Sequence, residues 1–182
     1  MIPLLTDWSN FYVITGSAAA GLTGLMFVVI TLVAGQERQI KNMRDGVETF
    51  SSPTVVHFGA ALLVSAILAA PWHTLMAPSI VLALGGLGGL AYSARVLVRM
   101  SRRTSYQPEI DDWIWYALLP AAAYVLILAA AIGLTTVPTI ACFALAVGTI
   151  ALIFTGIRNA WDIVTFIAVE MKISEPPPDE KG

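Results

Sequence analysis

Three long stretches of this 182-residue chain contain no Asp, Glu, Lys or Arg, and they constrain its fold more than any other feature. The stretches cover residues 8–36, 49–94 and 113–157, and they are 29, 46 and 45 residues long. The hydrocarbon core of a bilayer is about 30 Å thick, and a helix needs about 20 residues to cross it. One span fits the first stretch and two fit each of the others. We therefore expect an all-α integral membrane protein with five transmembrane helices.

Turn residues divide the two longer stretches. Prolines occur in APWHTLMAP at residues 70–78 and in GLTTVP at residues 133–138, and proline ends a helix and restricts the residue before it. At the start of the second span, Ser52 is a suitable N-cap and Pro53 suits the first helical position. The predicted spans are 8–34, 53–70, 78–99, 111–132 and 138–157.

Composition agrees with the membrane class. Only 12% of the residues are charged, compared with about 25% in a soluble domain, and the mean hydropathy is +0.77. The net charge of −2 gives no reason to expect a nucleic-acid partner. Cys142 is the only cysteine, so an intrachain disulfide is impossible. We expect one helical domain over residues 1–172 and a disordered, proline-rich cytoplasmic tail over residues 173–182.

Basic residues set the expected orientation. With five spans, all ten Lys and Arg residues fall on one side, in the first loop, in the third loop and the last helical turns before it, and in the C-terminal segment. The positive-inside rule places that side in the cytoplasm, so the N-terminus is expected outside and the C-terminus inside. The chain looks like a small protein of the bacterial inner membrane, and we expect it to be integral to the plasma membrane.

Small residues gather on one face of the first predicted span. Gly16, Ala20 and Gly24 are spaced four apart, and Ser17 and Gly21 lie beside them. Small residues let membrane helices approach closely, whereas large apolar residues on the other face suit acyl chains. We therefore predict that the small face contacts protein and the large face contacts lipid.

The third predicted span has a similar glycine ridge, and the ridges have two interpretations. They hold one chain's own bundle together, or they form a subunit interface or line a pore. The first is favoured for any single ridge, but several ridges in one short chain favour at least one contact between subunits. The packing or pore-lining candidates are Ser9, Asn10, Gly16, Ser17, Ala20, Gly21, Gly24, Thr31, Gly85 and Gly89.

Polar chemistry is sparse inside the predicted spans. No Asp, Glu, Lys or Arg lies deep in a span, and no metal-binding cluster or nucleotide loop is present, so we expect no catalytic residue, metal or cofactor. His57 lies about one turn from a span end, on the same face as Ser65. The pair is a candidate pH or ion contact. The favoured alternative is a histidine hydrogen-bonded to a neighbouring carbonyl or hydroxyl.

Arginines cluster where the third span ends. They are explained as a topology signal, and they also suit anionic lipid or the mouth of a pore. The candidates are Arg95, Arg99, Arg102 and Arg103.

Two further features concern the last two spans. Pro120 removes a backbone hydrogen bond and predicts a kink near Tyr116. Residues 158–172 form an amphipathic helix with an Arg158–Asp162 pair, separated from the fifth span only by Gly156. This segment either bends at Gly156 to lie on the inner membrane surface or projects to pack against a partner. The sequence does not favour one of these alternatives over the other.

Two non-enzymatic functions follow from these features. The preferred one is a homo-oligomeric channel or passive pore, since small and hydroxylated faces are available and five spans are too few to enclose a wide path alone. The alternative is a non-catalytic accessory or scaffolding subunit of a larger membrane complex. The expected partners are membrane lipid and further copies of the chain. A lipid-modifying enzyme is a third reading, and no nucleophile–base pair supports it.

Overall fold

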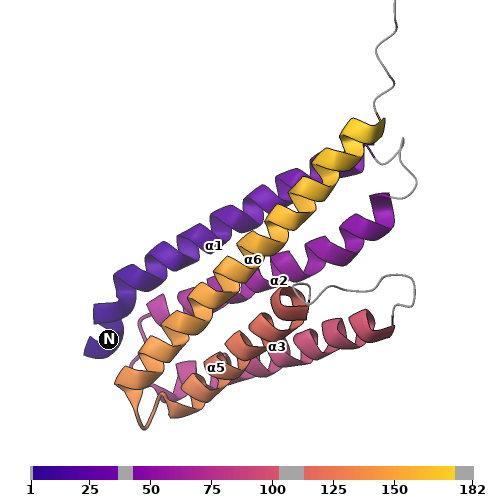
Figure 1. Cartoon of the computed structure of the whole chain (residues 1–182). Helices are drawn as coiled ribbons and strands as arrows, with labels where there is room; N and C mark the ends of the chain where they lie inside the picture. The colour runs from indigo at the N-terminus through magenta and orange to yellow at the C-terminus, as the bar shows by residue number, and fades with distance from the viewer. Residues whose placement is uncertain (1, 37–42, 103–112, 175–182) are drawn as a thin grey trace, which may run out of the picture.

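The computed structural model describes residues 2–36, 43–102 and 113–174, and its regular structure in these ranges is entirely helical. Figure 1 shows long helices that lie side by side. The elements in chain order are α1 (Pro3–Gln36), α2 (Met43–Ala69), α3 (Met76–Arg102), the π-helix η1 (Ile114–Leu118), α5 (Leu119–Gly133) and α6 (Pro138–Ser174).

Four apolar stretches are long enough to cross a membrane: Pro3–Thr31, Met76–Ser101, Ile114–Gly133 and Pro138–Thr165. The apolar part of α2, Pro53–Ala69, is shorter. Large apolar side chains such as Ile14, Leu84 and Phe154 are also well exposed on the outside of the bundle. Hydrocarbon is the solvent that suits such a surface. The chain is a membrane protein with transmembrane helices, as its composition predicts.

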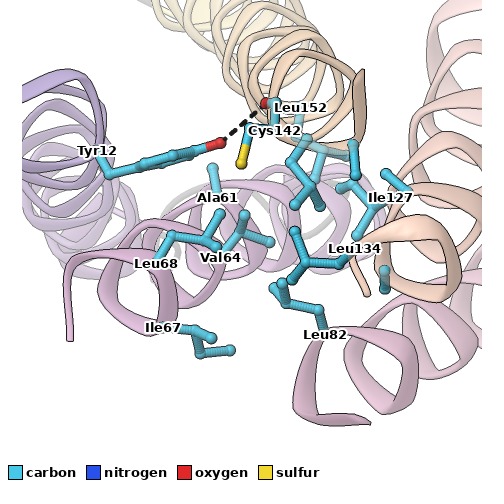
Figure 2. Packing of buried hydrophobic residues seen from close by; sticks show 14 of the residues in the cluster. Tyr12, Ala61, Val64, Ile67, Leu68, Leu82, Ile127, Leu134, Cys142 and Leu152 are labelled. Carbon is cyan, nitrogen blue, oxygen red and sulfur yellow. Dashed lines mark hydrogen bonds between the residues drawn. The ribbon is translucent and has the colours of Figure 1, made fainter. Parts of the chain in front are cut away.

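The helices pack in a continuous order. α2 contacts α1 and α6, and α5 contacts α3 and α6, while α2 also meets α3. Side chains from all five long helices fill the interior (Figure 2). A buried hydroxyl is tolerated in this apolar interior when it donates a hydrogen bond to a carbonyl of its own helix, as Thr149 Oγ1 does to Leu145 O at 2.7 Å. The core includes Tyr12, Ala61, Val64, Leu68, Leu82, Ile127, Leu134, Cys142 and Leu152.

The start of α2 differs from the prediction. The helix begins at Met43, ten residues before the predicted start, and Pro53 lies inside it. The prediction that Ser52 caps this helix is therefore wrong. A proline removes only one backbone hydrogen bond, and helices of membrane proteins tolerate that loss when neighbouring groups compensate. Residue 53 is buried in the bundle, where packing opposes a helix break.

A π-helical turn, η1, lies where a kink is predicted near Tyr116. Leu119 N–H donates to Ile114 O, which lies five residues back rather than four. Pro120 follows immediately and has no N–H to donate. The extra residue in this turn rotates η1 relative to α5. The predicted start of this span at residue 111 lies outside the described residues.

α6 is a single helix from Pro138 to Ser174, without a break at Gly156. The bend alternative is therefore wrong, and Gly156 has a different role. A Cβ atom built on Gly156 would lie 2.4 Å from Phe58 Cε1, so glycine at this position lets α2 approach α6. At 1.5 Å per residue, α6 is about 55 Å long. Residues 173 and 174 are helical, and the rest of the predicted tail lies outside the described residues.

Candidate functional site

The interior contains polar side chains that bond between helices, and the first of these contacts joins α1 to α2. Thr15 Oγ1 lies 3.0 Å from Ser65 Oγ, and Thr15 also donates to Phe11 O at 2.9 Å. Because the Thr15 proton is used in its own helix, the Ser65 hydroxyl donates to Thr15. Gly16 makes the approach possible, since a Cβ there would lie 3.0 Å from Ser65 Cβ. The structure thus brings together two predicted residues, Gly16 and Ser65.

Most of the predicted small face of α1 lies outside the bundle. Tyr12, Thr15 and Ala19 point inward instead, and Tyr12 OH donates to Cys142 O at 3.2 Å (Figure 2). The prediction that the small face holds this chain's own bundle together is therefore wrong beyond Gly16 and the half-buried Ser9, because these polar contacts fix the rotation of α1. The exposed candidates are Asn10, Ser17, Ala20, Gly21, Gly24 and Thr31.

Glycines on α3 divide in a similar way. Gly85 is exposed, and a Cβ there would meet none of the described atoms within 4 Å. Gly89 is buried, and a Cβ there would lie 2.1 Å from Tyr124 Cδ1. Gly86, which was not predicted, lies against the backbone of Leu128. The contact between α3 and α5 therefore uses Gly86 and Gly89. Gly85 was predicted to pack with Gly89, and within one chain this prediction is wrong because Gly85 faces outward.

His57 is fully enclosed at the contact of α2 with α5. Its side chain is 1% exposed, and Nδ1 lies 3.0 Å from Tyr124 OH. The ring of Tyr92 lies edge-on to His57, with 6.4 Å between ring centroids. Gly89 provides the space for the Tyr124 ring. Sequence reasoning named His57 and Gly89 but missed Tyr124, the residue that connects them.

Several buried polar atoms have no hydrogen-bond partner among the described residues. They are His57 Nε2, Ser93 Oγ and both amide atoms of Asn159. Asn159 is 0% exposed and follows Gly148 by three helical turns. Gly148 packs against Ile127 of α5, so Asn159 faces the η1 side of the bundle. Sequence reasoning placed Asn159 on the polar face of the amphipathic segment and missed its burial.

Ser93 lies beside an apolar groove between α3 and η1. The groove encloses about 450 Å³, and its walls include Leu90, Leu97, Trp113 and Ala117. Ser93 supplies the one hydroxyl group among the described lining residues. This volume lies within the range of small-ligand sites.

Charged side chains lie near one end of the helices. Arg158 pairs with Asp162 as predicted, and its guanidinium lies 5.9 Å from the centroid of the Trp115 ring. Arg95 and Arg99 are exposed. Arg102 ends α3, with a side chain outside the described set, and Arg103 lies outside the described residues. Within the described parts of the chain, no group of three or more His, Cys, Asp or Glu residues is placed to hold a metal ion.

Comparisons of this chain with models of known protein families, with curated proteins and with solved structures find no match.

Proposed function

We propose that the chain spans the bacterial inner membrane five times, with the N-terminus outside and the C-terminus in the cytoplasm. The additional span is the apolar part of α2, Pro53–Ala69, whose 17 residues reach the lower limit for crossing a bilayer. With this span, all ten basic residues fall on one side of the membrane. A four-span arrangement would divide them between the two sides.

Within this topology, we propose that the protein is a homo-oligomeric channel or passive pore. The observation that carries the proposal is the exposed small face of α1. A Cβ on Gly21 or Gly24 would meet none of the described atoms within 4 Å, and Ser17 and Ala20 are also exposed. Such a face gains little from lipid but allows close contact with another helix. Large side chains fill the interior of one chain, so a permeation path would lie between subunits.

The test combines oligomeric state with conductance. The wild-type chain in lipid nanodiscs should have a native mass that is a multiple of 19.4 kDa, and it should conduct in planar bilayers. Gly21→Leu combined with Gly24→Leu should lower the native mass to that of a dimer or a monomer and abolish conductance. Gly88→Leu is the matched control, because Gly88 is an exposed glycine with equally open surroundings on α3. A monomeric wild type, or conductance unaffected by the α1 substitutions, would refute the channel.

A second candidate is an accessory subunit of a larger membrane complex. The length of α6 favours it, since a helix of about 55 Å extends well beyond a hydrocarbon core of about 30 Å. The two candidates differ in what surrounds the chain. Extraction of the chain with its native lipids should give pure homo-oligomers if it is a channel. A fixed ratio to one different polytopic protein would favour the accessory subunit.

A further inference from the structure

The outer face of α6 carries a regular row of large apolar side chains. Beyond Ile140, its exposed large residues recur at alternating steps of four and three, and each is between 39% and 66% exposed. This spacing is the 3.5-residue repeat of a coiled coil. We name this row the α6 seam: Phe143, Val147, Ile150, Phe154, Ile157, Trp161 and Val164.

The seam continues past the length that a bilayer covers. A span that begins at Pro138 uses about 20 residues to cross the hydrocarbon and ends near Ile157. The charged pair of Arg158 and Asp162 follows at once. Trp161 and Val164 nevertheless remain 66% and 42% exposed on the same row. Lipid tails account for the first part of the seam, and a protein partner would remove the last part from water.

Residues beside the seam favour a closely packed partner helix. In a coiled coil, the positions next to the apolar seam face the partner's flanks, so their size affects how closely two helices approach. Three of the six flanking positions between Phe143 and Val164 are half-buried alanines, Ala144, Ala151 and Ala160, while Ala146 and Ile153 are buried in the chain's own bundle.

We propose that the α6 seam pairs with the α6 seam of a second copy of this chain, as a parallel coiled coil that begins in the membrane and continues into the cytoplasm. The seam carries no charge, so two identical seams meet without like-charge repulsion. The nearest charge, Arg158, is neutralised by Asp162 within its own helix. The inference rests on the proposed topology and self-association, because all copies then have the same orientation and their α6 helices are parallel. It adds a second contact to the proposed α1 contact.

Disulfide cross-linking in native membranes tests the pairing directly. Cys142, the only native cysteine, is first replaced by alanine, and single cysteines are then introduced between positions 157 and 165. Copper phenanthroline oxidises thiols that meet across a dimer axis. We expect disulfide-linked dimers at positions 157, 161 and 164, with yields at least tenfold higher than at positions 158, 162 and 165. Uniform or absent cross-linking would overturn the pairing and would leave the seam to lipid or to a different protein.

A charge placed in the seam provides the second test. Val164→Glu brings two carboxylates together in the proposed dimer, whereas Thr165→Glu places the same charge on the adjacent exposed position, beside the seam rather than in it. We expect at least a tenfold loss of cross-linking at position 161 for Val164→Glu and no loss for Thr165→Glu. Equal effects would contradict the seam.

The two proposed contacts fail in distinguishable ways. If Gly21→Leu with Gly24→Leu removes oligomers while the α6 positions never cross-link periodically, the α1 contact stands and the seam is refuted. If seam cross-linking persists and the α1 substitutions change neither native mass nor conductance, the seam stands and the channel assembled through α1 is refuted.

Discussion

Nδ1 of His57 lies 3.0 Å from the hydroxyl oxygen of Tyr124, and this hydrogen bond joins α2 to α5 inside the bundle. The Tyr124 ring in turn occupies the space left by Gly89 on α3. One histidine, one tyrosine and one glycine thus connect three helices at a single point. This arrangement agrees with the interpretation of His57 as a histidine bonded to a neighbouring hydroxyl, and it leads to separate predictions for the tyrosine and the glycine.

Removing the Tyr124 hydroxyl should destabilise the protein modestly. Tyr124→Phe keeps the ring and leaves His57 Nδ1 without its partner in a buried site, which costs about 1 kcal/mol of unfolding free energy. A cycle with His57→Phe should give a coupling of about 0.6 kcal/mol, typical for hydrogen bonds between membrane helices. The free energies come from reversible unfolding in mixed micelles. Additive effects of the two substitutions would contradict a direct hydrogen bond.

A methyl group at Gly89 should destabilise the contact between α3 and α5. The Cβ of Gly89→Ala would lie 2.1 Å from Tyr124 Cδ1, so the tyrosine ring must move, at a cost of about 1–3 kcal/mol. Gly88→Ala is the control, because the neighbouring glycine has open surroundings among the described residues and alanine favours helix there. Equal unfolding midpoints for the two variants would show that Tyr124 does not pack on Gly89.

The contact of Gly156 with Phe58 allows a rescue experiment. Gly156→Ala places its Cβ 2.4 Å from Phe58 Cε1, and we expect a loss of about 1–3 kcal/mol in unfolding free energy. A smaller side chain at position 58 should relieve the clash. The combined variant Gly156→Ala with Phe58→Leu should therefore be less destabilised than the sum of the single changes. If the double variant loses as much unfolding free energy as the two single variants together, or more, Phe58 does not contact Gly156. The same unfolding assay measures all three variants.

Sequence patterns predicted the helical membrane class well because a span must satisfy its backbone hydrogen bonds internally and needs about 20 apolar residues. Both requirements act within one segment of the chain, so they can be read from its sequence. They also identified Pro120 as a site of irregular helix, because proline lacks the backbone N–H that a regular helix needs. The rotation of each helix was harder to predict. The inward face of α1 is fixed by Tyr12 and Thr15, whose partners are 130 and 50 residues away in the chain. Small residues show that close contact is possible, but they do not identify the contacting helix.

Asn159 provides the sharpest test of the interior. Its amide is 0% exposed, and neither amide atom has a partner among the described residues. Burying an amide without hydrogen bonds costs about 1–3 kcal/mol, so Asn159→Leu, which has a similar size and no polar atoms, should raise the unfolding free energy by about that amount. Asn159→Asp should lower it, because the buried position disfavours a carboxylate. If the leucine variant is less stable than the wild type, the Asn159 amide has a hydrogen-bond partner in the folded protein, and the idea that it is buried without one is refuted.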